Sequence, residues 1–356
     1  MKKRWGGAGL VLAGCMVMSM ACGYYESREP EAGEESKQLN WNVPMEKDGK
    51  ILLRLANNQK PDHPASEACD YFAGLVRERT DDRIQIRVYH SAALGSEAET
   101  VKEVEYGSID MARVSIALLA GYNQELLALQ MPYLYEDEAH MWRVLDSSLG
   151  DRYLRSMEEK GMEGLCWYGA GARNFYTSAR EIKSLSDLNN MRIRVQESSF
   201  MMDVIGALGA IPVDLPYEDV RDALKKGEID GAENNFASYA SAGHYHEAPY
   251  MIMDEHVRVP EMVIMNCRVL EKLSPEDQAI IRQAASESSI KQRELWAEYE
   301  KEQWDVLKKA GVHVIDPGDK DAFRHMVQPI YDMYGAPYED ILTQIRQMGR
   351  AGDQRH

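Results

Sequence analysis

The chain has 356 residues, of which 44% are hydrophobic and 28% are charged, so it is long enough for two domains of a globular protein. Its 41 basic and 58 acidic side chains give a formal net charge of −17 at pH 7. This balance argues against binding to nucleic acid or anionic lipid through a basic surface. An anionic ligand would need a local cationic pocket that works against the field of the whole protein.

Residues 1–21 have the pattern of a secretory signal peptide. Lys2, Lys3 and Arg4 precede an uncharged run from Trp5 to Ala21, which small residues and a cysteine follow. The run is too short, and wrongly flanked, for a membrane-spanning helix. Removal of the three basic residues would change the formal charge from −17 to −20.

Two cysteines are candidates for the lipidated first residue of a bacterial lipoprotein. "LAGC", which ends at Cys15, is the better match to the usual lipobox, whereas "SMAC", which ends at Cys22, leaves a fuller apolar run and a polar mature start. We favour Cys22, and Cys15 stays open. Either one would anchor the protein by lipid. Cys69, Cys166 and Cys267 suggest neither a disulfide framework nor a metal site, and we expect buried free thiols.

Residues 22–47 are rich in Glu, Ser, Lys and Gly with little periodicity, as in a flexible tether. After it, strands and helices alternate. We expect strands at 51–56, 84–89 and 109–114, a helix over 63–80, and a second helix that begins with the capping box Ser96–Glu99 and ends at Gly107. This order predicts a parallel sheet with helical crossovers.

A later passage repeats the construction of an earlier one. The segments that start at Val101 and Val220 are both an amphipathic helix, then Gly-x-Ile-Asp, then a short strand that leads to polar residues. Two lobes of similar construction would explain the similarity, and so would a joint that recurs in α/β proteins. In open α/β sheets, ligands bind beyond the carboxyl ends of strands, so two facing lobes would form a cleft.

The stretch 274–310 is helical in pattern. Ser274 is a candidate N-cap with Pro275 in the first turn, and Lys308, Lys309 and Gly311 mark the end. One continuous helix would be about 55 Å long, longer than a single lobe is wide. A strut across both lobes and two helices that break near 286–289 both fit the sequence.

Two arginines are candidates for an anion site. In "MRIRVQES" (191–198), alternation places Arg192 and Arg194 on one face of a strand and apolar residues on the other. "GAGARNFYTS" places Arg173 among small residues, and "DGAENNFASY" places polar residues, Glu233, Asn234 and Asn235, directly after another strand. Guanidinium binds carboxylate in a bidentate manner, and Asn offers both a donor and an acceptor to hydroxyls. The alternative is an arginine at a sheet edge that pairs with Asp or Glu.

A metal-dependent enzyme is the competing interpretation. "HYHE" (244–247) and "DEH" (254–256) bring together residue types that bind zinc, His244, His246, Glu247, Glu255 and His256. Their spacing matches no zinc signature. The sequence also has no Gly-rich phosphate loop and no Gly-x-Ser-x-Gly elbow. We therefore expect no metal site, no cofactor and no catalytic residues.

Several segments, in this order, resemble the extracytoplasmic solute-binding proteins of TRAP (tripartite ATP-independent periplasmic) transporters. They are "HPASEACDYFAGLVRERTDDRIQIRVYHSAALGSEAE", "GSIDMARVS", "LQMPYLYEDEAH", "GARNFYTS", "SLSDLNNMRIRVQES" and "ALGAIPVDLPYEDVRDALKKGEIDGAENN". The resemblance covers roughly residues 51–310. It is more specific than any single motif because order and spacing agree.

The resemblance implies an α/β fold of the two-lobe periplasmic-binding-protein kind (type II-like). Each hinged lobe would have a central β-sheet flanked by helices, and a long C-terminal helix would cross both. We place lobe I at 48–169 plus 260–300, and lobe II with the C-terminal helices at 170–259 plus 301–356.

The resemblance also implies ligand contacts. Arg194 would bind the ligand carboxylate, with Arg173 and Asn234 beside it. Weaker correspondences are Ser115, from the other lobe, and the loop residues Asn57, Asn58 and His63. "RVQESSFMMDVIGALGA" and "ENNFASYASAGHYHEAPYMIMDEHVRVPE" resemble the branch that binds hexuronates, whose hydroxyls would meet Asn234, Asn235 and Glu97. Phe236 stands where the family often has tryptophan, which leaves the exact sugar open. C4-dicarboxylates, sialic acid and other organic acids also stay open.

The implied partners are a carboxylate-bearing solute, the small four-helix and large multi-helix TRAP membrane subunits, and the lipid anchor, with no nucleic acid. The implied location is extracytoplasmic, on the outer face of the cell membrane or in the periplasm. An ABC importer or a membrane sensor as the membrane partner is the alternative.

Overall fold

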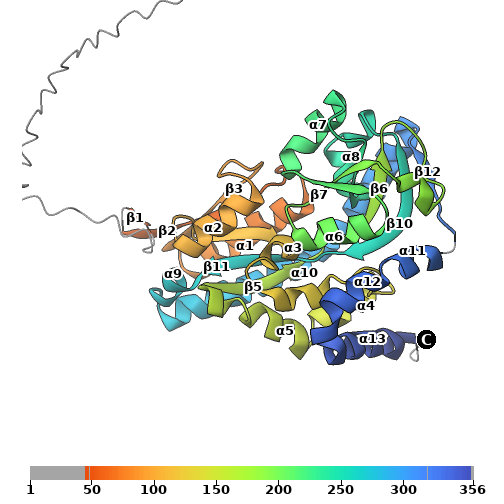
Figure 1. Ribbon diagram of the computed structural model, residues 1–356. Coiled ribbons are helices and arrows are strands. Elements are labelled where there is room, and N and C mark those ends of the chain that lie inside the picture. The colour runs from red at the N-terminus through yellow and green to blue at the C-terminus, as the bar shows by residue number, and fades with distance from the viewer. Residues whose placement is uncertain (1–44, 48, 319, 354–356) are drawn as a thin grey trace, which may run out of the picture. The chain divides into compact units, whose positions relative to one another are not determined.

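The computed structural model describes residues 45–47, 49–318 and 320–353. The predicted signal peptide, both candidate lipidation cysteines and most of the predicted tether lie outside these residues. Within them the chain is α/β, as predicted, with two separate six-stranded sheets whose faces helices cover (Figure 1).

The first sheet has the order β1-β2-β4-β11-β5, with β3 beside β2. Its strands are β1 (Met45–Lys47), β2 (Lys50–Ala56), β3 (Ile84–Tyr89), β4 (Met111–Ser115), β5 (Met162–Tyr168) and β11 (Glu261–Asn266). Strand β2 pairs in parallel with β3 and β4, which confirms the crossovers expected from the sequence. Helices α1 (Pro64–Arg79) and α2 (Glu97–Tyr106) make the connections, and the predicted Ser96–Glu99 capping box begins α2.

The second sheet has the order β12-β10-β6-β9-β7-β8. Its strands are β6 (Ala172–Thr177), β7 (Arg192–Val195), β8 (Ile211–Asp214), β9 (Gly231–Asn235), β10 (Tyr250–Arg258) and β12 (His313–Ile315). Helix α7 (Val220–Lys226) leads into β9 through Gly227 as α2 leads into β4 through Gly107, and both glycines have a left-handed backbone. The repeated pattern in the sequence is therefore a repeated structure.

The chain passes between the two sheets at residues 169–171, from β5 to β6, and at 259–260, from β10 to β11. Gln292 fixes the first link, because its side-chain amide accepts from the Gly169 N–H (2.9 Å) and donates to the Gly169 carbonyl (2.9 Å). Gly171 has a φ of +65°, which favours glycine at this turn. Both links lie beside the predicted lobe boundaries, and those boundaries stay a prediction.

Helix α10 (Pro275–Ala310) is continuous over 36 residues. Of the two alternatives that the sequence left open, one long helix is therefore the one that forms. The Ser274 hydroxyl accepts from the Asp277 N–H, and Gly311 ends the helix in a left-handed conformation. In the region where a break was considered, Ser289 donates to the Trp167 carbonyl at 2.5 Å. Helix α10 packs on α1 and β5 and also on α8 (Phe236–Ser241), so it contacts elements that belong to both sheets.

The remaining helices enclose the sheets. They are α3 (Ile116–Leu119), α4 (Glu138–Leu145), α5 (Ser148–Arg155), α6 (Ser199–Ala207), α9 (Cys267–Glu271), α11 (Asp321–Met326), α12 (Gln328–Ile330) and α13 (Glu339–Asp353). Short 3-10 turns are η1 (Gln124–Leu129), η2 (Glu158–Lys160), η3 (Leu185–Leu188), η4 (Tyr217–Asp219), η5 (His244–His246) and η7 (Ala336–Tyr338), and η6 (Tyr331–Gly335) is a π-helical turn. Helix α13 packs on α4, where His140 Nε2 lies 2.7 Å from the Ile345 carbonyl oxygen.

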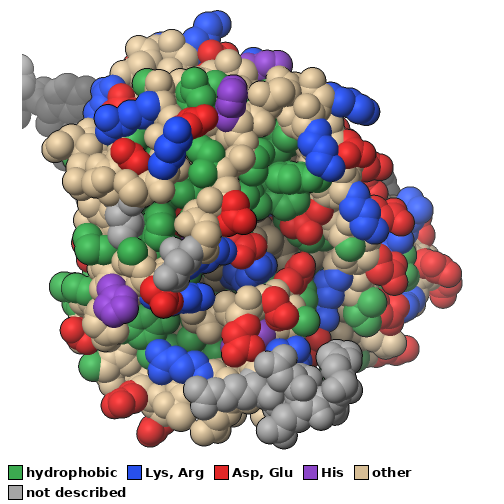
Figure 2. Space-filling model, turned by 90° about the vertical axis from the view of Figure 1, so that its right-hand side faces the viewer, with side chains coloured by type: hydrophobic (Ala, Val, Ile, Leu, Met, Phe, Trp, Pro, Cys, Tyr) green, Lys and Arg blue, Asp and Glu red, His purple; other side chains and the backbone are tan. Residues whose placement is uncertain are grey.

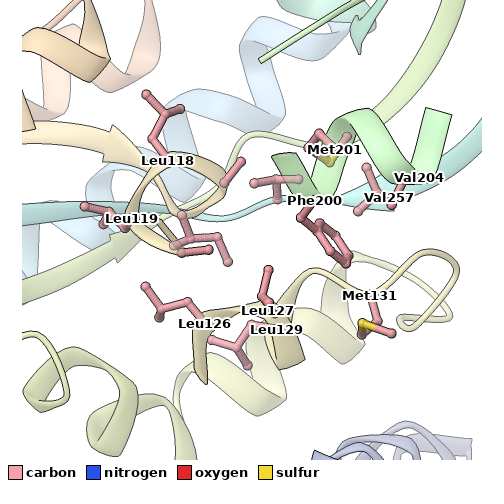
Figure 3. Close-up of a cluster of buried hydrophobic side chains, with 14 of the residues drawn as sticks. Leu118, Leu119, Leu126, Leu127, Leu129, Met131, Phe200, Met201, Val204 and Val257 are labelled. Carbon is pink, nitrogen blue, oxygen red and sulfur yellow. The ribbon is translucent and has the colours of Figure 1, made fainter. Parts of the chain in front are cut away.

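A buried apolar cluster joins elements that flank the two sheets (Figure 3). Leu126 and Leu129 of η1, together with Met131, face Phe200 and Met201 of α6, which follows β7 of the second sheet. All five side chains are almost fully buried. This contact stabilises the arrangement in which the polar ends of the two sheets face each other.

Acidic and basic side chains are intermixed on the face drawn in Figure 2. This agrees with a composition that has many charged residues of both signs. Within the described part of the chain, no helix combines the length and the apolar character that crossing a membrane requires. Cys69 and Cys166 are buried free thiols, and Cys267 is a half-buried one.

Candidate functional site

A polar cavity lies where β4, β7 and β9 end. Its empty volume, which includes space open to solvent, is about 550 Å³. Its wall is formed by Asn58, Gln59, Glu97, Ser115, Leu118, Ala170, Arg173, Arg194, Gln196, Glu197, Tyr217, Asn234, Asn235, Ser238, Val259 and Glu261. These residues come from elements of both sheets, so the cavity is the cleft that two facing lobes would form.

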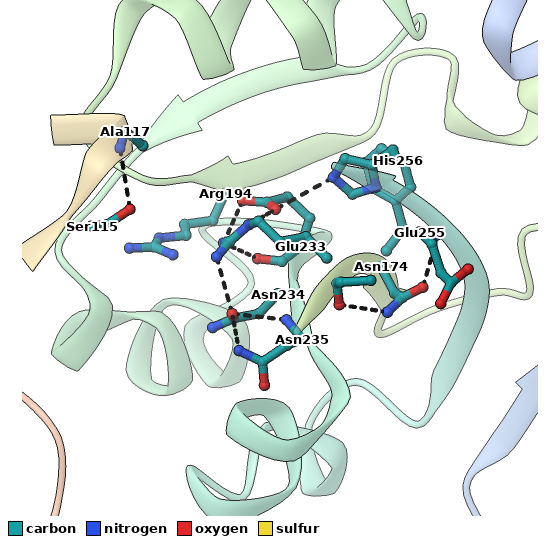
Figure 4. Close-up of polar contacts among 12 residues, drawn as sticks. Ser115, Ala117, Asn174, Arg194, Glu233, Asn234, Asn235, Glu255 and His256 are labelled. Atoms are coloured by element: carbon teal, nitrogen blue, oxygen red, sulfur yellow. Dashed lines mark hydrogen bonds and ion pairs between the residues drawn. The ribbon is translucent and has the colours of Figure 1, made fainter. Parts of the chain in front are cut away.

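Arg194 is a buried cation that forms no ion pair with a carboxylate of the described residues. The side chain is 3% exposed, and its Nε and Nη2 donate to the Leu215 carbonyl at 2.9 and 2.6 Å. Burial lowers the pKa of this guanidinium, and the charge of Arg173 adds to the effect against the opposing charge of Glu233. Figure 4 shows the guanidinium pointing toward the side where Ser115 lies.

Arg192 shares the face of strand β7 with Arg194 but lies at the start of this inner strand, where it pairs with an acid. Its Nη2 and Nε donate to the two oxygens of Asp230 at 2.7 and 3.1 Å, and 42% of its side chain is exposed. The two interpretations weighed for this strand therefore apply to different residues. Arg192 pairs with Asp230 at the start of the strand, and Arg194 faces the cavity.

Arg173 is also buried, but a protein carboxylate already neutralises it. Its Nε and Nη2 donate to the two carboxylate oxygens of Glu233, the second at 2.8 Å, and its Nη1 donates to Asn234 Oδ1 at 3.1 Å. Burial would raise the pKa of Glu233, but the charge of Arg173 and the contact with His256 hold it at about 2. The Arg173 Nη2 also donates to the Glu233 main-chain carbonyl at 2.9 Å, so Arg173 has one Nη1 N–H left for the cavity and little free charge.

His256 lies behind this pair, stacked on Phe175 at 4.5 Å between ring centroids. Its Nδ1 is 2.9 Å from Asp254 Oδ2, and its Nε2 is 3.4 Å from Glu233 Oε2 as an ion pair without hydrogen-bond alignment. Burial would lower the pKa of His256, but the two carboxylates raise it to about 9. The Glu233 carboxylate thus interacts with two cations, the His256 imidazolium and the Arg173 guanidinium. Figure 4 shows the contact between Glu233 and His256 as a dashed line.

The two strand ends of the repeated helix–Gly–strand unit place helix caps in the cavity wall. Ser115 ends β4 and its hydroxyl accepts from the Ala117 N–H at 3.2 Å. Asn235 ends β9 and its Oδ1 accepts from the Ser238 N–H at 2.7 Å. The side-chain oxygens of both residues accept from backbone N–H groups as helix caps. The groups left to donate to a ligand are the Ser115 hydroxyl proton and the Asn235 side-chain NH₂.

The opposite wall is organised around Arg113, which is 1% exposed. It forms an ion pair with Glu261, lies 3.4 Å from Glu97, and donates to the side-chain oxygens of Asn57 (3.0 Å) and Asn58. One cation therefore serves two carboxylates. Burial raises the pKa of Glu97 to about 7 against the charge of Arg113, so near neutral pH this carboxyl can both donate and accept.

Seven of the nine residues predicted from the sequence line this cavity, and they are Asn58, Glu97, Ser115, Arg173, Arg194, Asn234 and Asn235. Asn57 lies behind the wall, where its amide donates to the Ser66 hydroxyl at 2.7 Å and its oxygen accepts from Arg113. His63 lines a neighbouring cavity instead. The structure thus shows where the nine predicted residues lie, and their contacts with a ligand stay predictions.

Sequence reasoning missed several polar residues of the wall, namely Gln59, Gln196, Glu197, Tyr217, Ser238 and Glu261, together with Arg113 behind it. Gln196 and Glu197 directly follow β7, and the rule that ligands bind beyond strand ends could have found them. Glu261 has no local signal, because the antiparallel return of β11 brings it beside β4.

The histidines considered for a metal site are separated. His244 lies in η5, where its Nδ1 is 2.8 Å from the Tyr176 hydroxyl, whereas His256 lies on β10 between Glu233 and Asp254. In the residues that the structure describes, no group of three or more His, Cys, Asp or Glu side chains is arranged to hold a metal ion.

The buried imidazolium predicts a pH dependence of stability. The pKa of His256 is about 9 in the folded protein and 6.5 in a model peptide, so its contribution is fully present below pH 6.5 and is lost as the pH rises through 9. We expect the free energy of unfolding, measured with denaturant, to fall between pH 6.5 and 9. His256→Gln should flatten this fall. An equally steep fall in the variant would contradict the assignment.

Residues 55–336 match the family model of bacterial extracellular solute-binding proteins, family 7 (DctP). A solute-binding protein of Chromohalobacter salexigens is 31% identical over 293 residues, which are 82% of this chain and 87% of that protein. The 2,3-diketo-L-gulonate-binding periplasmic protein of Escherichia coli (strain K12) is 30% identical over 256 residues, 72% of this chain and 78% of that protein.

Solved structures agree with these sequence matches. A TRAP periplasmic solute-binding protein from Bradyrhizobium sp. BTAi1, in complex with α/β-D-galacturonate, has a TM-score of 0.81 and 35% identity over 83% of this chain and 99% of its own. A TRAP periplasmic solute-binding protein from Pseudomonas putida F1 with bound D-glucuronate has a TM-score of 0.81 and 28% identity over 83% of this chain and 96% of its own.

These matches confirm the resemblance to TRAP receptors and the two-lobe fold that it implies, including the long helix that contacts both lobes. They also indicate a binding protein and an extracytoplasmic location. The chain therefore belongs to the DctP family of bacterial extracellular solute-binding proteins, the solute receptors of TRAP transporters.

Proposed function

We propose that this receptor captures a hexuronate, glucuronate or galacturonate, in the cavity between its lobes and delivers it to the membrane subunits of a TRAP transporter. The observation that carries the proposal is the buried guanidinium of Arg194, which has no carboxylate partner in the described structure. Desolvating an arginine without a counter-ion is costly, and an acid group of the ligand would remove that cost. The step is binding with lobe closure, and it needs no covalent chemistry.

The opposite wall favours hydroxyl groups over a second acid. Glu97 and Glu261 share the single cation Arg113, so this side carries excess negative charge. Carboxylates accept hydrogen bonds from sugar hydroxyls but repel another carboxylate. A ligand with one acid end and one hydroxyl-rich end fits both walls. This arrangement supports a hexuronate over a C4-dicarboxylate, which stays the second candidate.

The relatives support the same class of ligand. The structural neighbours from Bradyrhizobium and Pseudomonas contain galacturonate and glucuronate, and the Escherichia coli relative is named for binding 2,3-diketo-L-gulonate. All three ligands are six-carbon sugar acids with one carboxylate. Phe236, which stands where the family often has tryptophan, is half-buried and packs edge-on against Trp304 at 5.4 Å between centroids. It lies outside the set of residues that line the cavity.

Replacing Arg194 tests the central contact. Arg194→Ala should weaken hexuronate binding by about 2–5 kcal/mol, because the ligand carboxylate would be buried without its partner. Arg192→Ala is the matched control, because it removes an arginine two residues away on the same strand face, whose half-exposed ion pair with Asp230 and hydrogen bond to the Gly227 carbonyl lie outside the cavity. Isothermal titration of both variants with glucuronate and galacturonate measures the effect. Equal losses in the two variants, or no loss in the first, would contradict the proposal.

A series of ligands tests the charge of the two walls. D-glucuronate should bind tightly, and D-glucose should bind at least about 100-fold more weakly because it lacks the group that faces Arg194. D-glucarate has a second carboxylate that would face Glu97 and Glu261. It should therefore bind at least about tenfold more weakly than D-glucuronate. Titration at pH 8, above the pKa of Glu97 of about 7, keeps Glu97 ionised. Glucarate or succinate binding as tightly as glucuronate would exclude this account of specificity.

The lipid anchor is a further part of the proposal, and it rests on the sequence. Cys22 would carry the lipid and hold the receptor at the outer face of the cell membrane, with residues 23–47 as the tether. In cells given labelled palmitate, we expect Cys22→Ser to abolish labelling of the protein and Cys15→Ser to leave it. The reverse pattern would move the anchor to Cys15.

A further inference from the structure

A second cavity adjoins the proposed hexuronate site. Its empty volume, counted in the same way, is about 1000 Å³, and it shares Asn58, Gln59 and Tyr217 with the first cavity. The loop after β2 forms one side, and the segments around η4 and α8 form the other. Lys60 connects these two sides, since its Nζ donates to the Ser241 carbonyl at 2.9 Å. The two cavities are therefore adjacent parts of one cleft.

The lining of the second cavity is aromatic and carries no net charge. Tyr217 and Tyr299 contribute rings, and so do the imidazoles of His63 and His244. Burial lowers the pKa of both histidines to about 3, with added effects of Arg113 on His63 and of Arg194 on His244, so both are neutral at physiological pH. The charged residues of the lining are two cations, Lys60 and Arg221, and two anions, Glu218 and Asp222.

His63 has a hydrogen-bond donor that the protein does not use. Its Nδ1 accepts from the Ala65 N–H at 3.2 Å as the cap of α1, so the proton of the neutral ring lies on Nε2. That nitrogen has no hydrogen-bond partner in the described residues, and His63 is 4% exposed. The ring packs edge-on against Tyr299 at 5.3 Å and Trp296 at 5.7 Å between centroids. An unpaired buried donor of this kind is costly unless a ligand or water satisfies it.

Aromatic rings, neutral imidazoles and side-chain amides are the groups that bind a neutral sugar, because rings cover its C–H faces and amides meet its hydroxyls. A second acid would find no cation in excess here, in contrast to Arg194 in the first cavity.

We infer that the receptor also takes an acidic disaccharide, with its uronate ring in the first cavity and a neutral sugar in the second. This inference rests on the proposed function, and it extends the ligand class from a free hexuronate to a uronate with a neutral glycosyl neighbour.

Two isomeric ligands test the inference, namely β-D-glucosyl-(1→4)-D-glucuronate and β-D-glucuronosyl-(1→4)-D-glucose. They place the neutral ring on opposite ends of the same uronate, so together they cover both orientations of the chain. In isothermal titration, one of the two should bind at least about tenfold more tightly than free D-glucuronate. A gain below tenfold for both isomers would overturn the inference.

A variant that fills the second cavity provides the control. Ala242 lines that cavity, ends α8 with a right-handed helical backbone and lies outside the lining of the first cavity, so Ala242→Leu adds bulk without backbone strain. This variant should abolish the gain for the disaccharide and change the affinity for free glucuronate by less than about threefold. An unchanged disaccharide gain in Ala242→Leu would overturn the inference.

Failure of the inference and failure of the proposed function are distinguishable by the free monosaccharides. Tight binding of glucuronate or galacturonate without a gain for either disaccharide overturns the inference alone. No binding of any uronate to the wild-type receptor overturns the proposed function together with the inference. Thermal unfolding of the unliganded Ala242→Leu variant, at a midpoint close to that of the wild type, establishes that the variant is folded.

Discussion

The structure depends on one buried positive charge that the protein does not neutralise itself. Arg173 and Arg113 are equally buried, yet Glu233 pairs with the first, and Glu97 and Glu261 pair with the second. Arg194 has only the Leu215 carbonyl as a partner among the described residues. A protein tolerates such a group when another state supplies the missing anion. We propose that in this receptor that state is the complex with its solute.

The rest of the cleft limits which anion can supply that charge. The His256–Glu233–Arg173 network removes one guanidinium from competition for the ligand and fixes its donors in place. The Arg113 wall presents two carboxylates that accept from hydroxyls and repel a second acid. Helix α10, which contacts α1 and α8, connects the two halves behind the cavity, and the links at 169–171 and 259–260 are the places where a hinge would bend.

Much of this arrangement follows from local sequence. The capping box at Ser96, the helix–Gly–strand unit and the alternation in "MRIRV" each predict the structure that forms. Long-range pairing is what the sequence cannot show. Whether Arg173 or Arg194 is already neutralised depends on the register of β6 against β9, which brings Glu233 to Arg173. Glu261 reaches Arg113 from 148 residues away along a return strand, so no local pattern announces it.

The most direct test is a crystal structure of the receptor with glucuronate or galacturonate bound. The account predicts the ligand carboxylate within about 3 Å of the Arg194 guanidinium nitrogens, with the ring hydroxyls on the side of Glu97 and Glu261. A complex in which Arg194 turns to a protein carboxylate, or in which the acid group of the ligand lies on another residue, would contradict it.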